Sequence, residues 1–310
     1  MSPRRGATGL SGVLALDKPA GMTSHDVVAV VRRATGERRV GHAGTLDPLA
    51  TGLMTVLVGP ATRLEPYLSG HDKTYVATIA FGQSTDTDDA DGIVTATLAV
   101  PPEITDPAAA RQLLSTFLGM QEQLPPAYSA IKQGGLIAHR AARAGEPLAL
   151  ASRPIVVHAV ELLAIDASLP AWDVRFTVTK GTYIRSLARD IGTRAGTAAH
   201  ITELRRTHAG TLSVEDAVPL SAFDSPLSGD ELAARFIDPV AALGLPALFD
   251  VDSDAVATGR AVRVPPGAAL EPHSLVALCT ADSLLALYRR DGDLLVPAVV
   301  LAVPAKGVRR

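Results

Sequence analysis

Residues 41–52 read GHAGTLDPLATG, and this stretch is the most unusual part of the chain. Its three glycines and its proline impose an irregular backbone around one histidine, His42, and one aspartate, Asp47. A rigid loop that presents an acid between apolar residues suits a carboxylate in a partly dry pocket, where a nearby cation keeps it ionised and nucleophilic. The same pattern also fits a plain turn in which Asp47 caps the backbone ahead of Pro48. Local chemistry leaves both interpretations open.

Other chemistries do not fit the loops of this region. An aspartyl-phosphate nucleophile should have a second aspartate two residues on, but residue 49 is Leu. A zinc site would need more ligands than His42 and Asp47. The acidic loop 86–92 invites a calcium interpretation, but its glycine comes one place late and residue 97 is Thr where a calcium loop needs Glu. We therefore expect a hydrogen-bonded turn at 86–92.

The segments on either side of residues 41–52 carry signals of secondary structure. An apolar run at 13–16 predicts a strand, and Thr23 or Ser24 can cap a helix that stops at Gly36. Residues 121–153 have a mixed composition, and we expect a mobile segment with one short helix there. From Leu245 short strand-like runs indicate a small β-rich module. Further strands are predicted at 53–58, 75–81 and 172–179, and further helices at about 107–119, 182–194 and 198–205.

The composition is that of a globular protein of a reducing compartment. Hydrophobic residues make up 47% of the 310 residues and charged residues 20%, so the chain has ample material for a core. The single cysteine, Cys279, excludes an intramolecular disulfide and any multi-cysteine metal site. No signal-peptide pattern opens the sequence, and the longest apolar tract, 294–305, is broken by prolines and too short for a membrane span. We expect a soluble, cytoplasmic protein.

The charge balance does not by itself point to nucleic acid. The formal net charge is −3, from 29 basic and 32 acidic residues. Arginines nevertheless occur in local groups, as at 205–206, so a balanced total can hide a basic face. Lysines are few, and most lie in Gly-, Pro- or Tyr-bearing strings where a compact ammonium is useful. These are Lys18, Lys73, Lys132 and Lys180.

The string KGTYIR, residues 180–185, places a tyrosine and an arginine two apart at a predicted strand-to-helix transition. Two residues apart in an extended segment lie on one side, so we expect Tyr183 and Arg185 to face the same way. The arginine can pair with a loop carboxylate, and the tyrosine can pack against a planar ligand. A surface arginine beside a core tyrosine remains the alternative.

Several strings together resemble the TruB family of tRNA pseudouridine-55 synthases. They occur in the family's order and spacing, and with LDKPAGMTSHDVV at 16–28 they span about residues 12–206. The strings are GHAGTLDPLATGLMTVLVGPATR (41–63), DKTYVATIAFGQSTDTDDADG (72–92), PPAYSAIK (125–132), KGTYIRSLARDIG (180–192) and ELRR (203–206). Five such strings in order are not a chance match.

The resemblance implies a fold and a division into domains. The fold class is α+β, with a mixed, largely antiparallel sheet flanked by helices. A catalytic domain would cover residues 1–240, with an RNA-clamping insertion at about 121–153. Residues 245–305 would form a PUA-like RNA-binding domain that holds the far end of the tRNA. The insertion departs from the family at His139, where a tyrosine is expected, and this departure bears on the RNA affinity of the insertion rather than on the chemistry.

The resemblance also implies a reaction. The chain would convert one uridine, at position 55 in the T loop of the tRNA T arm, to pseudouridine without a cofactor or a metal. The base must be flipped out of its loop and held, because it cannot be attacked inside the folded loop. Asp47 would be the nucleophile, Tyr75 would stack on the target base, and Arg185 would pair with Asp47 and lower its pKa. Whether Asp47 attacks the ring or the ribose is open.

The remaining implied site residues bind the substrate. His42 would hold the splayed T loop open, Tyr183 would line the base pocket, and Leu204 would close its apolar wall. Lys18 and Lys180 would be supporting cations near the site or the RNA backbone. We expect a monomer, because one cleft serves one tRNA.

Three functions remain to be weighed. The first is the isomerase, and the second is a non-catalytic protein that binds and folds tRNA on the same scaffold. The intact set Asp47, Tyr75, Tyr183 and Arg185 favours catalysis, because a pure binder would not need the nucleophile. The third, an unrelated carboxylate enzyme that acts on small nucleotides, would not bind tRNA in a gel shift.

Overall fold

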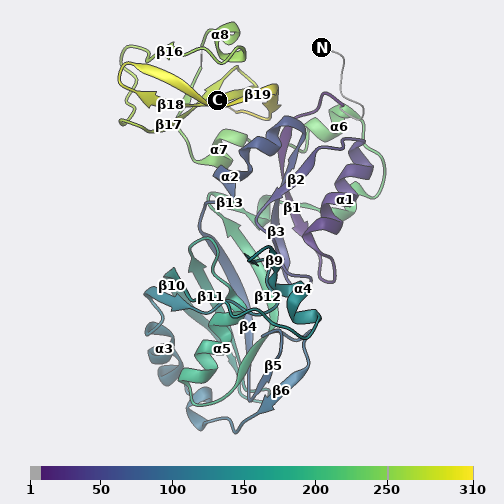
Figure 1. Ribbon diagram of the computed structural model, residues 1–310, viewed down its shortest axis with the longest axis vertical. Coiled ribbons are helices and arrows are strands. Elements are labelled where there is room, and N and C mark those ends of the chain that lie inside the picture. Colours follow the sequence, from purple (N-terminus) through teal and green to yellow (C-terminus); the bar gives the residue numbers. More distant parts are fainter. Residues whose placement is uncertain (1–7, 250, 310) are drawn as a thin grey trace. The chain divides into compact units, whose positions relative to one another are not determined.

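The structure is a computed structural model and describes residues 8–249 and 251–309. The chain divides into two compact units (Figure 1). Unit 1 comprises the described residues of 1–71 and 208–310, and unit 2 comprises residues 72–207. Most strand pairs in both units are antiparallel and helices accompany each sheet, so the predicted α+β architecture with a mixed, largely antiparallel sheet is confirmed.

The sheet of unit 1 joins strands from the beginning and the end of the chain. Its strand order is β15 (Ala247–Leu248), β17 (Leu275–Cys279), β18 (Ser283–Asp291), β19 (Leu294–Lys306), β1 (Gly12–Lys18) and β3 (Thr51–Val58). β1 and β3 are antiparallel, with Gly12 opposite Val58 and Lys18 opposite Gly52. β19 joins β1 in parallel, with Gly12 opposite Lys306. The predicted strands at 13–16 and 53–58 are therefore confirmed within slightly longer elements.

Short elements complete unit 1. β2 (Val40–Ala43) pairs with β3, β16 (Val262–Arg263) with β19, and β14 (Val218–Pro219) with β1. β13 (Leu212–Ser213) pairs with the end of β12 (Ala199–Ala209). The short helices are α2 (Glu65–Leu68), α6 (Gly229–Ala233), α7 (Pro239–Leu243) and α8 (Ser253–Ala257).

Helix α1 (Ser24–Thr35) begins and ends where the sequence predicts. Thr23 is the N-cap, and its side chain accepts a hydrogen bond from the backbone of Asp26 while the Asp26 carboxylate accepts one from the backbone of Thr23. This reciprocal capping box satisfies two helix-end donors. Gly36 ends the helix in the left-handed conformation, with φ 65°, which a glycine adopts without strain.

The C-terminal strands share a core with the N-terminal strands. One buried cluster contains Val13 and Leu57 from β1 and β3 together with Cys279, Leu287 and Val299 from β17, β18 and β19. A second cluster, which includes Val256 and Tyr288, lies within the C-terminal residues alone. The predicted division into domains 1–240 and 245–305 stays a prediction.

Unit 2 is built on a five-stranded path. The strand order is β12, β4 (Lys73–Phe81), β11 (Ala171–Val178), β10 (Arg153–Asp166) and β7 (Gly119–Gln123). β4 alternates strictly between buried and half-buried residues, as its sequence predicts. Helices α3 (Pro107–Ser115) and α5 (Ile184–Arg194) accompany this sheet, and α3 contacts both β10 and α5 (Figure 1).

The predicted helix at 198–205 is wrong, because these residues begin the long strand β12. The sequence AHITELRR is rich in helix formers, yet burial alternates over residues 203–207. Leu204 and Arg206 are buried, while Glu203 is exposed and Arg205 and Thr207 are half-buried. Pairing within the sheet therefore overrides local helix propensity here.

The segment 121–153 has more regular structure than its sequence suggests. It contains the end of β7, a small hairpin of β8 (Lys132–Gln133) and β9 (Leu136–Ile137), and the helix α4 (Ala138–Arg143), which is the predicted short helix. Outside it, β5 (Gln83–Thr85) and β6 (Val94–Thr97) form another hairpin. Within residues 8–249 and 251–309, no helix has both the length and the hydropathy needed to cross a bilayer.

Candidate active site

The predicted site residues fall into two groups, and each group is fixed within its own unit. Lys18, His42 and Asp47 belong to unit 1. Tyr75, Lys180, Tyr183, Arg185 and Leu204 belong to unit 2.

The Asp47 loop connects β2 to β3 and is fixed by hydrogen bonds on both sides of Asp47. The Ser24 hydroxyl donates to the Leu46 carbonyl at 3.1 Å and accepts from the Leu46 N–H at 2.9 Å. The Gly21 N–H donates to the Pro48 carbonyl at 2.9 Å, and the Ala50 N–H donates to the Asp47 carbonyl at 3.1 Å. The loop therefore holds a half-buried carboxylate on a backbone that is hydrogen-bonded on both sides.

Lys18 holds this loop through hydrogen bonds from its ammonium group. Its side chain is fully buried, and its Nζ donates to the carbonyl oxygens of Pro19 (2.9 Å), Met22 (2.7 Å) and Pro48 (3.2 Å). An ammonium has three donors, so these contacts tie the turn after β1 to the Asp47 loop. This geometry favours the supporting role predicted for Lys18 near the site over a contact with the RNA backbone.

His42 lies on β2, shortly before the Asp47 loop. Its ring is half-buried and meets the His25 ring edge to face, with 5.9 Å between the centroids. His25 is in the first turn of α1, so both rings adjoin the elements that hold the loop.

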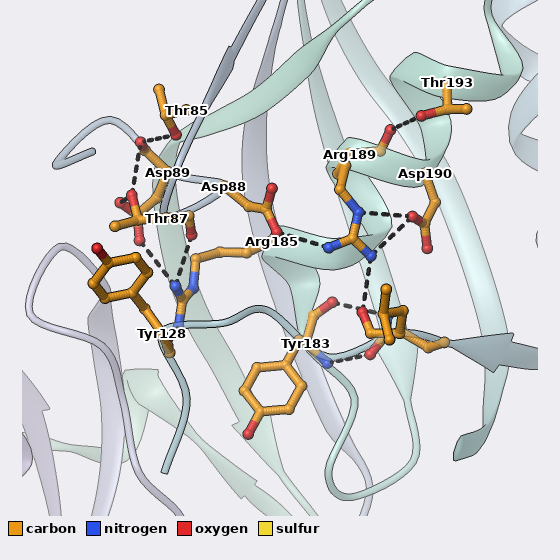
Figure 2. Close-up of polar contacts among 12 residues, drawn as sticks. Thr85, Thr87, Asp88, Asp89, Tyr128, Tyr183, Arg185, Arg189, Asp190 and Thr193 are labelled. Carbon is orange, nitrogen blue, oxygen red and sulfur yellow. Dashed lines mark hydrogen bonds and ion pairs between the residues drawn. The ribbon is translucent and has the colours of Figure 1, made fainter. Parts of the chain in front are cut away.

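Arg185 is the most constrained charged residue of the unit 2 group. It lies in the first turn of α5 and is 4% exposed. Its Nη1 donates to the Thr87 carbonyl at 2.8 Å and its Nη2 to the Tyr128 carbonyl at 3.0 Å, as Figure 2 shows. Its Nη1 also lies 3.4 Å from Asp89 Oδ2. The sequence identified Arg185 but not these partners.

The acidic loop 86–92 is a hydrogen-bonded turn, as predicted. Asp89 Oδ1 accepts from the Thr87 hydroxyl at 2.6 Å and from the Asp91 N–H at 3.1 Å. Asp88 pairs with Arg189 at 2.9 Å, and burial raises the pKa of the Asp88 carboxyl while Arg189 opposes that rise. The described residues contain no group of three His, Cys, Asp or Glu side chains arranged to hold a metal ion. This loop is therefore a support for Arg185 and α5 (Figure 2).

Tyr183 is the N-cap residue of α5 and has an extended backbone, with φ −98° and ψ 113°. The expectation that Tyr183 and Arg185 lie two apart in one extended segment is wrong, because Arg185 is already helical. The Tyr183 N–H donates to Gln123 Oε1 at 2.8 Å, and Gln123 Nε2 donates to the Tyr183 carbonyl at 3.0 Å. The Arg153 guanidinium carbon lies 4.9 Å from the centroid of the Tyr183 ring.

Two further predicted residues lie on the sheet of unit 2. Tyr75 is 9% exposed on β4, opposite Phe176 of β11. Leu204 is 6% exposed on β12, the strand next to β4. Lys180 is exposed in the turn between β11 and α5. The Tyr75 ring and the apolar Leu204 side chain therefore lie on adjacent strands, and Lys180 places a cation just beyond the end of β11.

The sequence singled out Lys73 only as a lysine in a tyrosine-bearing string. The structure shows it 6% exposed, on the same face of β4 as Tyr75. Burial, with the positive charges of Arg206 and Lys180, lowers its pKa to about 8, while Asp72 acts in the opposite direction.

Comparison with known proteins shows which family this chain belongs to. The pattern of the N-terminal domain of TruB family pseudouridylate synthases matches residues 32–184, and that of the C-terminal domain of tRNA pseudouridylate synthase B matches residues 185–243. tRNA pseudouridine synthase B of Thermobifida fusca (strain YX) is 44% identical over 301 residues, which cover 94% of this chain and 98% of that protein. The protein of the same name from Opitutus terrae is 47% identical over 228 residues, which cover 74% and 92%.

Solved structures share the fold. One is an H/ACA ribonucleoprotein bound to a substrate RNA containing 2′-deoxyuridine, with a TM-score of 0.64 and 26% identity over 94% of this chain and 84% of that chain. Another is an archaeal box H/ACA complex of Nop10 and Cbf5, with the same TM-score and identity over 94% and 86%. With sequence similarity over nearly its whole length, the chain belongs to the TruB family of pseudouridylate synthases.

Proposed function

We propose that this protein is an isomerase that converts uridine 55 in the T loop of tRNA to pseudouridine, with Asp47 as the nucleophile. The observation that carries the proposal is the 44% identity to a tRNA pseudouridine synthase B over 94% of the chain. The GTLDP string that contains Asp47 lies in the matched region. The rigid loop around Asp47 suits a group that must meet its target without rearranging.

The reaction rejoins a detached base through carbon, so it needs no net oxidation or reduction. It needs a flipped base, an ionised carboxylate and a pocket that confines the free base. In the proposal Tyr75 stacks on the flipped uracil, and Tyr183 and Leu204 form the walls of its pocket. Arg185 pairs with Asp47 and keeps it ionised, because a nearby guanidinium stabilises a carboxylate.

The remaining contacts of the proposal hold the RNA. His42 keeps the T loop splayed, Lys180 supplies supporting positive charge, and segment 121–153 clamps the T arm, while Lys18 is a supporting cation near the site. The region 245–305 contacts the far end of the tRNA as a PUA-like domain, and residues 1–240 form the catalytic domain. We further propose that the protein acts as a monomer, since one chain carries every residue named for the reaction. We also propose that it acts in the cytoplasm, where its tRNA substrate would be modified.

Conversion of an unmodified tRNA transcript tests the proposal. The wild-type protein should convert uridine 55 to pseudouridine, and it should leave a matched transcript with cytidine at position 55 unmodified. An isolated T arm with the same loop should also be converted, because the residues proposed for the reaction itself contact the T loop. Binding of the transcript without conversion would instead identify a tRNA-folding protein.

A further inference from the structure

We infer that Gln123 and Arg153 are positioning residues that together hold Tyr183 against the target base. The inference rests on the proposed function, in which Tyr183 lines the base pocket. Gln123 and Arg153 lie directly opposite each other at one end of the β7–β10 pair. Both side chains reach Tyr183, one to its backbone and the other to its ring.

Gln123 fixes the Tyr183 backbone with both ends of its amide. The side chain is 1% exposed, its Oε1 accepts from the Tyr183 N–H at 2.8 Å, and its Nε2 donates to the Tyr183 carbonyl at 3.0 Å. Figure 2 marks contacts at both the nitrogen and the carbonyl oxygen of Tyr183. Because the N–H and C=O of Tyr183 are both engaged, the Gln123 amide holds the backbone of Tyr183 and with it the direction of its Cα–Cβ bond.

This backbone position needs such a contact. A tyrosine side chain cannot cap a helix start, and Tyr183 forms no side-chain cap for α5. Its carbonyl also accepts the first hydrogen bond of α5, from the Leu187 N–H at 3.1 Å. Gln123 therefore fixes Tyr183 at the point where an extended segment changes to a helix, and Arg185 follows in the first turn.

Arg153 acts on the ring rather than the backbone. Its guanidinium carbon lies 4.9 Å from the centroid of the Tyr183 ring, within the range of a cation–π contact. Its Nε and Nη2 are buried and have no hydrogen-bond partner in the described part of the chain. Buried donors without partners reduce stability, so a role in stability alone does not explain this placement. Orientation of the Tyr183 ring does explain it.

Paired substitutions distinguish positioning from structural support. Gln123→Met keeps the side-chain length and removes both hydrogen bonds, and Arg153→Met removes the charge over the ring. Matched controls are Gln121→Met, two residues earlier on β7, whose side-chain amide donates to the Thr116 and Leu118 carbonyl oxygens, and Arg175→Met on β11. Conversion of unmodified tRNA transcript is measured as kcat and KM, with thermal unfolding of each variant as a control for folding.

We expect kcat to fall about tenfold in Gln123→Met and about threefold in Arg153→Met, with KM changed less than about threefold, because small misplacements reduce rate more than affinity. Both controls should stay within about twofold of the wild type. Arg153→Lys, which retains a cation, should recover part of the loss. Unchanged kcat in both Gln123→Met and Arg153→Met would overturn the inference, while wild-type turnover would leave the proposed function intact.

The same substitutions made in a Tyr183→Ala variant show whether Gln123 and Arg153 act through Tyr183. In Tyr183→Ala protein, adding Gln123→Met or Arg153→Met should reduce kcat by less than about twofold further, because the positioned ring is gone. Full multiplication of the separate losses would overturn the inference. If Gln123→Met does not fold, the Arg153 series decides alone. Absence of conversion by the wild type would count against the proposed function itself.

Discussion

Arg185 carries a buried positive charge whose guanidinium group lies against several oxygen atoms. Its guanidinium contacts two carbonyl oxygens and the Asp89 carboxylate, and it is 4% exposed (Figure 2). Buried charges persist where they are paired, and removal of one partner is costly. Within unit 2 the Asp89 loop and the start of α5 therefore hold a fixed positive charge. In the proposed reaction this charge acts on Asp47.

Replacement of Arg185 should impair turnover more than binding. In Arg185→Met the single-turnover rate on unmodified tRNA should fall at least about 100-fold, while the dissociation constant changes less than about tenfold, because the guanidinium acts on the nucleophile. Rapid quench and filter binding measure the two quantities. Equal losses in rate and affinity would show that Arg185 is an RNA contact only.

Lys73 should make stability depend on pH. Burial lowers its pKa from 10.5 to about 8 in the folded protein. Between these two values the unfolded chain binds the proton and the folded chain has released it, so this residue makes the free energy of unfolding rise with pH. Below pH 8 both states carry the proton, and the residue contributes no slope.

The comparison of wild type with Lys73→Met isolates that slope. Urea unfolding across pH 8 to 10.5 should show a rise in the wild type relative to the variant. Cys279, whose pKa is raised to about 12 by burial, acts in the opposite direction but equally in both proteins. Parallel curves for the two proteins over this range would contradict the assignment.

At the scale of single elements, α1 supports the Asp47 loop through its first residue. Ser24 begins the helix and exchanges two hydrogen bonds with Leu46. The capping box of Thr23 and Asp26 fixes where the helix begins, and hydrogen bonds from Thr23 lower the pKa of the Asp26 carboxyl. The position of the loop therefore depends on the start of α1.

Loss of this cap should cost stability. Thr23→Ala removes the side-chain acceptor of the Asp26 N–H, so the free energy of unfolding should fall by about 1 kcal/mol, as is typical of N-cap deletions. Thr23→Ser, which retains the hydroxyl, is the matched control and should remain close to wild type. Chemical denaturation of the three proteins measures the difference, and an unchanged Thr23→Ala variant would show that the cap is not stabilising.

Elements with local signals could be predicted from the sequence. The cap and the C-terminal glycine delimit α1, and the alternation in DKTYVATIAF predicts β4. β12 could not be predicted, because its Ala, Glu, Leu and Arg residues favour a helix and only pairing within the sheet makes it a strand. The sequence does not predict the long strand β10 either, because burial along it is irregular.

The sequence predicts some residues of the candidate site but not the residues that hold them in place. Asp47, Tyr75, Tyr183 and Arg185 lie in strings that the sequence alone makes conspicuous. Their supports do not, because Gln123 contacts Tyr183 across 60 residues and Thr87 contacts Arg185 across 98. Such contacts follow from tertiary structure and have no local pattern.

At the scale of the whole molecule, unit 1 joins both ends of the chain in one core. Cys279 lies in the buried cluster that β1 and β3 share with β17, β18 and β19, and it is 1% exposed. Burial raises the pKa of its thiol to about 12, and the thiolate is the form that reacts. This single cysteine can therefore report the opening of that core.

A thiol reagent should not modify the native protein at neutral pH. Labelling should occur at the rate of global unfolding, because the shared core must open to expose Cys279. Mass spectrometry of the labelled chain, with denatured protein as the positive control, measures this rate. Labelling much faster than global unfolding would show that the C-terminal strands open separately from β1 and β3.

The proposed reaction depends on the carboxylate of Asp47, and one substitution tests that dependence directly. Conversion of uridine 55 in an unmodified tRNA transcript is measured with wild-type and Asp47→Asn protein side by side. We expect conversion by the wild type alone and tRNA affinity within about tenfold of each other, because the change is nearly isosteric and removes only the nucleophile. Continued turnover by the Asp47→Asn protein would contradict the assignment of Asp47 as the nucleophile.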